Sequence, residues 1–121
     1  MTPASAIGFE HVRRDSHEIL EVRGELDLTN ADMLDEALAQ TSTRAVIVDL
    51  AGLGFVDSTG MRAIDQAHRR LAAAGRTLLI VAPADSTAGW TFRIAGFGNG
   101  SVLESLDVAL ELVPDEREPR L

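Results

Sequence analysis

The central segment of the chain, residues 45–61, reads AVIVDLAGLGFVDSTGM. The first four residues form a continuous apolar, largely β-branched run, the pattern of a strand that is covered on both faces. Small and polar residues follow this run. The sequence therefore predicts a strand over Ala45 to Leu50, a loop over Ala51 to Val56 and a helix that begins close to Ser58.

The helix predicted after this segment separates two buried strands. Its apolar stripe at helical spacing consists of Met61, Ile64, Ala67 and Leu71, and Gly75 is expected to end it. Residues 78–81 repeat the apolar strand pattern. A β-α-β crossover joins parallel strands, so the end of the first strand and the start of the helix should meet at one sheet edge. Ligands and partners tend to bind at such an edge.

The rest of the chain extends this unit in both directions. A hairpin is expected from strands over Gly8 to Arg13 and His17 to Arg23, and Thr29 or Asn30 can cap a helix to about Gln40. A helix over Ser86 to Ile94, a strand over Ser101 to Leu103 and a helix over Ser105 to Leu112 follow, with breaks at Gly96, Gly98 and Gly100. The prediction is one α/β domain over residues 8–113, with a mixed sheet, about four helices and flexible tails over 1–7 and 114–121.

Composition excludes several classes of protein. The chain has 121 residues, a formal charge of -8 and a pI near 4.7, and this charge opposes nucleic-acid binding. We find neither a signal peptide nor an apolar run of membrane length, so a cytoplasmic protein without membrane insertion is expected. There is no cysteine, and all 11 basic residues are arginine. Thiol chemistry, Schiff bases and a P-loop lysine are therefore absent, and no cofactor is expected.

Ser58 has two compatible interpretations. Asp57 or Ser58 can simply cap the helix, because aspartate and serine are preferred at that position. Alternatively, Ser58 carries a phosphate, which the free N–H groups and dipole of a helix start would accommodate. Asp57 would repel that phosphate, so modification should change the local surface.

Enzymatic and metal-binding alternatives fit the sequence poorly. A hydrolase would need a base near Ser58, but His68 is ten residues away along one helix, or about 15 Å. A phosphoaspartate receiver would use Asp49, but it requires a lysine, so Asp49 is interpreted as a loop-forming residue. The acidic residues Asp32, Asp35 and Glu36 lack the spacing of a calcium loop and are expected to form a solvated face. His11 and His17 are expected on the surface, and Trp90, Phe92 and Phe97 are expected to close the core.

Several separate motifs resemble one family. They are GELD at 24–27, VDL at 48–50, FVDSTGM at 55–61 and AGF at 95–97. Together, in this order over about residues 8–113, they resemble the STAS domains of bacterial anti-sigma factor antagonists. The family often has a second serine where Thr59 stands and an aliphatic residue where Met61 stands, and both departures are mild.

The resemblance implies a non-enzymatic partner switch. In that family the unmodified protein binds an anti-sigma factor serine kinase and so releases a sigma factor; phosphorylation by that kinase blocks binding, and a PP2C-type phosphatase restores it. Carried over, Ser58 is the acceptor and Thr59 a weaker candidate. Asp57, Gly60 and Met61 belong to the partner-binding turn, and Asp27 lies on the neighbouring loop, as a partner contact or merely a turn residue. The alternative is a non-catalytic STAS subunit of a lipid-transport or stress-signalling complex.

Overall fold

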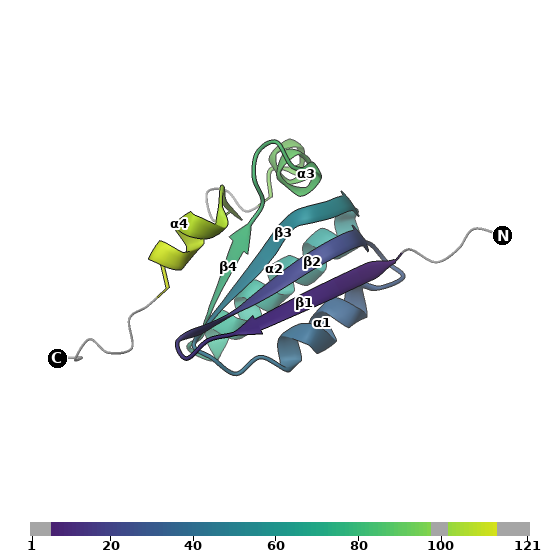
Figure 1. Ribbon diagram of the computed structural model, residues 1–121. Helices are drawn as coiled ribbons and strands as arrows, with labels where there is room; N and C mark the ends of the chain where they lie inside the picture. The colour runs from purple at the N-terminus through teal and green to yellow at the C-terminus, as the bar shows by residue number, and fades with distance from the viewer. Residues whose placement is uncertain (1–5, 98–101, 114–121) are drawn as a thin grey trace.

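The protein is a mixed sheet with helices on both faces (Figure 1). A computed structural model describes residues 6–97 and 102–113. Apart from Ala6 and Ile7, the predicted tails lie outside this range, as do Gly98, Gly100 and Ser101. The elements are β1 (Ile7–Arg13), β2 (His17–Leu26), α1 (Ala31–Ala39), β3 (Ala45–Val56), α2 (Ser58–Ala73), β4 (Thr77–Val81), α3 (Thr87–Ala95), β5 (Val102–Leu103) and α4 (Leu106–Glu111).

The sheet has the order β1-β2-β3-β4-β5. The β1–β2 hairpin is antiparallel, and β2, β3, β4 and β5 pair in parallel. The predicted fold class, a mixed α/β sheet with an opening hairpin and parallel central strands, is therefore confirmed.

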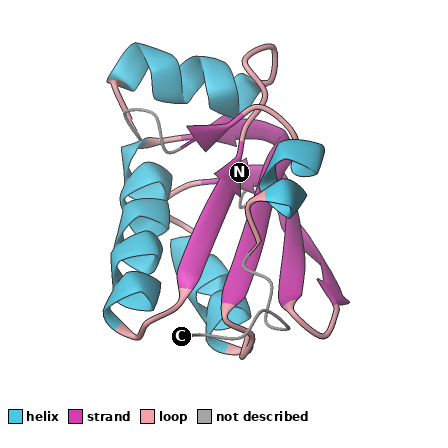
Figure 2. Cartoon of the chain, turned by 90° about the vertical axis from the view of Figure 1, so that its left-hand side faces the viewer, coloured by secondary structure: helices cyan, strands magenta, loops and turns pink. Residues whose placement is uncertain are grey.

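Alternation along β3 divides the core between the two sheet faces. Val46, Val48 and Leu50 pack in one cluster with apolar side chains of α1 and α2. Ile47 points to the other face, where it packs with Ala109 of α4. α3 lies across the end of the sheet, at the top of Figures 1 and 2.

β3 is twice as long as an average strand, and this corrects the sequence prediction. A loop was predicted over Ala51 to Val56, but these residues continue the strand to Val56. They stay extended because β2 runs alongside them, with Leu26 opposite Val56. Asp49 is likewise a strand residue and no loop former: it pairs with Glu21 and Val81, and its carboxylate accepts a hydrogen bond from Ala51 N.

α3 places its aromatic residues on opposite faces. Phe92 is buried, and its ring centroid lies 4.6 Å from that of Phe97. Trp90, which was predicted to close the core with them, is 56% exposed. Two residues along a helix correspond to about 200° of rotation, so Trp90 faces solvent when Phe92 faces the core. Gly96, with a φ of 68°, ends the helix in the left-handed conformation.

A buried carboxylate holds together the end of the sheet opposite α3. The Glu18 side chain on β2 is 0% exposed. One oxygen accepts hydrogen bonds from His11 at 2.8 Å and from Arg13 at 3.2 Å, both on β1. The other accepts from Ser42 N at 2.8 Å, Thr43 N at 2.9 Å and the Thr43 hydroxyl at 2.6 Å. Glu18 therefore ties the hairpin to the loop that follows α1.

These hydrogen bonds set the ionisation of Glu18. Burial raises the pKa of its carboxyl, but the bonds from Thr43, Ser42 and His11 outweigh burial and lower the pKa from 4.5 to about 2. A carboxyl whose pKa is lower in the folded chain contributes stability above its unfolded pKa. That contribution is lost as the pH falls from 4.5 toward 2.

We predict that Glu18→Gln lowers the free energy of unfolding at pH 7 by about 3 kcal/mol, the value of this pKa shift. The exposed Glu10→Gln, which removes only the ion pair with Arg23, should cost less than about 1 kcal/mol. Urea unfolding at pH 7 and pH 3 measures both. The difference in free energy of unfolding between wild type and Glu18→Gln should be smaller at pH 3 than at pH 7. An equal difference at both pH values would show that the ionised Glu18 carboxylate does not stabilise the fold.

Candidate functional site

Because β2 and β3 pair in parallel, the turns that follow them lie together at the carboxyl ends of the strands, under α3. Leu26 is paired with Val56, and Asp57 N donates to Leu26 O at 3.2 Å, continuing the strand pairing by one residue. Asp27 follows Leu26 directly, so the β2–α1 loop and the start of α2 leave the sheet side by side. The structure thus brings the predicted residues Asp27 and Asp57 into one region.

Asp57 connects these two segments. It is the N-cap of α2, where its Oδ1 accepts from Gly60 N at 2.9 Å. Its Oδ2 accepts from Leu28 N, in the β2–α1 loop, at 3.3 Å. One carboxylate therefore caps the helix and holds the neighbouring loop against it.

Ser58 is the first residue of α2 and is exposed. Because Asp57 supplies the cap, the Ser58 hydroxyl has no capping role, and it forms no hydrogen bond with any residue in 6–97 or 102–113. Thr59 comes next and is half-buried. Of the two predicted phosphate acceptors, Ser58 is the more accessible.

Asp27 shapes the loop beside the helix start. Its Oδ1 accepts from Thr29 N at 2.9 Å and from the Thr29 hydroxyl at 2.6 Å. Asn30 is 2% exposed; its Oδ1 accepts from Asp27 N at 3.0 Å and its amide donates to Glu25 O at 2.8 Å. Asn30 occupies the cap position of α1 but uses its side chain for the loop. Asp27 thus has the turn role, and a partner contact through it stays a prediction.

Gly60 is buried where α2 leaves the sheet. A β-carbon there would lie 2.8 Å from Leu26 Cγ, 2.9 Å from Leu26 O and 3.0 Å from Val56 Cγ2. These contacts are shorter than normal van der Waals distances, and one of them is to backbone. Glycine therefore allows α2 to begin directly against the ends of β2 and β3.

A shallow cavity of about 440 Å³ lies beside the first turns of α2. On the α2 side it is lined by Met61, Arg62 and Asp65, and on the other side by residues 95–97 at the end of α3. Met61 is half-buried and packs against the core. The predicted partner-binding residue Met61 therefore lies at the seam between α2 and α3.

Sequence reasoning missed four exposed apolar side chains at this end of the molecule. Leu28 is 75% exposed and Phe55 is 46% exposed, on the loop and strand next to Ser58. Trp90 and Ile94, at 56% and 68% exposed, share the outer face of α3. The spacing of four between Trp90 and Ile94 was a signal for a common face, but the nearby Phe92 suggested a core helix.

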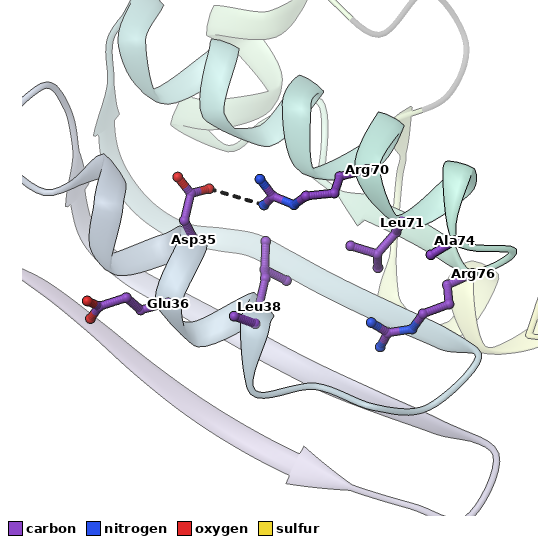
Figure 3. Close-up of a pocket in the computed structure, with 8 residues that line it drawn as sticks. Asp35, Glu36, Leu38, Arg70, Leu71, Ala74 and Arg76 are labelled. Carbon is purple, nitrogen blue, oxygen red and sulfur yellow. Dashed lines mark hydrogen bonds and ion pairs between the residues drawn. The ribbon is translucent and has the colours of Figure 1, made fainter.

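A larger cavity, of about 550 Å³, lies between α1 and α2 (Figure 3). Arg70 Nη2 is 3.4 Å from Asp35 Oδ1, and Arg76 donates to the Thr41 hydroxyl at 3.0 Å. Arg70 is twelve residues from Ser58, about 18 Å along α2. Both arginines of this cavity therefore already have partners, and the cavity is separate from the Ser58 region.

The histidines considered as catalytic or metal-binding residues lie apart from one another in the structure. His11 binds Glu18 and the His17 ring accepts from or donates to the Ser16 hydroxyl at 3.0 Å, while His68 is ten residues along α2 from Ser58. Within the described ranges, no group of three or more acidic, histidine or cysteine side chains is arranged to hold a metal ion. None of the helices described is both long enough and apolar enough to cross a membrane.

Fold and site together define a small α/β domain with an exposed serine at a capped helix start. The STAS domain family model matches residues 9–106, and the chain belongs to this family. No curated protein sequence matches the chain.

Solved structures share the fold. An anti-sigma factor antagonist from Mycobacterium paratuberculosis is 23% identical, with a TM-score of 0.77, covering 95% of this chain and 100% of that one. SpoIIAA in its unphosphorylated form, also an anti-sigma factor antagonist, is 22% identical, with a TM-score of 0.64 and coverage of 88% and 94%. A sulfate transporter family protein from Wolinella succinogenes is 25% identical, with a TM-score of 0.65 and coverage of 84% and 88%.

We predict that Gly60→Ala lowers the free energy of unfolding by about 1 to 3 kcal/mol, because the added methyl group meets Leu26. Alanine normally stabilises a helix relative to glycine, so the expected sign is reversed here. Gly8→Ala is the matched control, since no atom lies within 4 Å of its β-carbon position. Thermal or urea unfolding decides: a Gly60→Ala variant as stable as wild type would contradict the close approach.

Proposed function

We propose that this chain is a cytoplasmic anti-sigma factor antagonist that works as a partner switch. In its unmodified form it binds an anti-sigma factor serine kinase, and a sigma factor is released. The kinase transfers the γ-phosphoryl group of ATP to Ser58 Oγ, ADP leaves, and the hydroxyl proton passes to a base of the kinase. A PP2C-type phosphatase hydrolyses the phosphoserine and restores binding.

The observation that carries this proposal is the position of Ser58. Its hydroxyl is exposed in the first turn of α2, and Asp57 has already satisfied the cap and fixed the neighbouring loop. A phosphate can therefore be added without removing a hydrogen bond that the described residues make. It would bring roughly -1.5 to -2 charges to a surface that already carries Asp57. A partner docked there would meet a different electrostatic field.

The structural neighbours add support. The protein from Mycobacterium paratuberculosis is described as an anti-sigma factor antagonist, and SpoIIAA has been solved both unphosphorylated and phosphorylated. The first of these matches over its whole length.

A second candidate is a non-catalytic STAS subunit of a transport or stress-signalling assembly. The similarity to a sulfate transporter family protein, at 25% identity, favours it. The two functions differ in their dependence on Ser58. A regulator needs the serine to change its state, whereas an accessory subunit needs only the surface.

We predict that an anti-sigma factor serine kinase from the same organism phosphorylates Ser58 in the presence of ATP. Peptide mass spectrometry should place the phosphate on Ser58. Ser58→Ala should abolish the modification, and the adjacent Thr59→Ala should leave it intact. In pull-downs with ATP, Ser58→Ala should stay bound and Ser58→Asp should bind weakly. Equal binding of both variants would favour the accessory subunit, and phosphate on another residue would overturn the site assignment.

We also predict that the exposed face of α3 contacts the kinase, because α3 and the start of α2 line one cavity and lie at the same end of the molecule (Figures 1 and 2). Trp90→Ala should weaken binding about tenfold or more, since large aromatic residues dominate interface energies. The free energy of unfolding of Trp90→Ala should differ from that of wild type by less than about 0.5 kcal/mol, because Trp90 is exposed.

Val108→Ala is the matched control for this measurement. Val108 is 40% exposed on α4, which packs on the sheet face away from α1 and α2. Calorimetric titration of the kinase compares both variants with wild type. If Trp90→Ala and Val108→Ala lose affinity equally, or if Trp90→Ala loses none, α3 is not part of the docking surface.

A further inference from the structure

Arg62 lies one helical turn after Ser58 on α2. We propose that Arg62 binds the phosphate of phosphorylated Ser58 and holds it over the cavity between α2 and the end of α3. This inference rests on the proposed function, since it concerns the phosphorylated state of the same serine.

Helix geometry places Arg62 within reach. Side chains four residues apart on a helix are neighbours, with roughly 5–6 Å between their β-carbons. At 3.6 residues per turn, Arg62 is rotated about 40° from Ser58, and Asp65 about 20° in the other direction. Both Arg62 and Asp65 line the cavity of about 440 Å³. The cavity therefore opens on the side of α2 from which the Ser58 side chain projects.

The charges around this position single out Arg62 as the cation that can receive a phosphate. It forms no ion pair with the residues that the structure describes, and it is exposed. The carboxylate of Asp65 lies 3.1 Å from Arg69 Nε, one turn further along. The opposite wall, residues 95–97, carries no charged side chain.

The acidic groups on this side already have donors. Asp57 accepts hydrogen bonds from two backbone N–H groups with its two oxygens. Asp27, on the neighbouring loop, accepts from the Thr29 backbone and hydroxyl. A phosphate on Ser58 adds further negative charge beside them, and Arg62 is the nearby group that offsets it. Guanidinium is well suited to this, because its planar fork can donate two hydrogen bonds to phosphate oxygens.

In the modified state, Arg62 offsets the charge of the phosphate, which the N–H groups and dipole of the helix start also accommodate, so the fold stays intact. The phosphate and Arg62 together then cover the α2–α3 seam. A partner is excluded by an altered surface and not by local unfolding.

The test uses the full chain with phosphoserine installed at position 58 during translation, so no kinase is needed. ³¹P NMR titration measures the second pKa of the phosphate, which Arg62 should lower by favouring the dianion. Arg62→Gln should raise this pKa by about 0.2 to 0.4 unit. Arg14→Gln is the matched control, because Arg14 is likewise exposed and forms no ion pair with the described residues, but lies in the β1–β2 turn, at the other end of the sheet.

Two further readings complete the test. The difference in the second phosphate pKa between wild type and Arg62→Gln should be smaller in 1 M NaCl, where exposed charges are screened. The change in melting temperature on phosphorylation should be less favourable in Arg62→Gln than in wild type or Arg14→Gln. An unchanged phosphate pKa in Arg62→Gln, or an equal pKa change in Arg14→Gln, would overturn the proposal. Failure of the kinase to modify Ser58 would instead overturn the proposed function alone.

Discussion

β2 and β3 pair in parallel along most of their length, from His17 opposite Ala45 to Leu26 opposite Val56. Each strand is long, and their ends, Leu26 and Val56, stay in register although bulges interrupt the ladder. Because parallel strands end at the same edge, the following turns must leave the sheet together. This pairing creates the core surface for α1 and α2, and it also determines that the β2–α1 loop lies beside the start of α2.

Asp57 and Gly60 convert this shared edge into a defined surface. Asp57 joins helix and loop through its two oxygens, and Gly60 allows the helix to begin in contact with Leu26. At the opposite end of the sheet, Glu18 joins the hairpin to the loop after α1 by a similar use of both carboxylate oxygens. Each end of the parallel pair is therefore held by one acidic side chain that links segments distant in sequence.

The sequence predicts those features that arise from local patterns. The apolar runs at 45–48 and 78–81 identify the central strands, and the cap residues place α2 to within one residue. The extension of β3 to Val56 could not be predicted, because Gly52 and Gly54 weaken the strand pattern and the pairing with β2 is long-range. Burial of Glu18 also has no local signal, since its five hydrogen bonds come from two other segments. At the site, the sequence placed Ser58 at the start of α2, but the bridging role of Asp57 required the fold.

The position of Ser58 inside a helical turn has a consequence for how it can be recognised. The start of α2 is held against the loop after β2, and the next turn of α2 faces the end of α3 across a cavity, so the region around Ser58 combines segments that are far apart in the chain. A peptide that spans residues 50–65 would lack these neighbours and, at this length, would form a helix only marginally in water. Any enzyme that modifies this serine therefore recognises a three-dimensional surface and not a linear motif. Selectivity among proteins of the same fold then depends on the shape around the serine, even where the local sequence is identical.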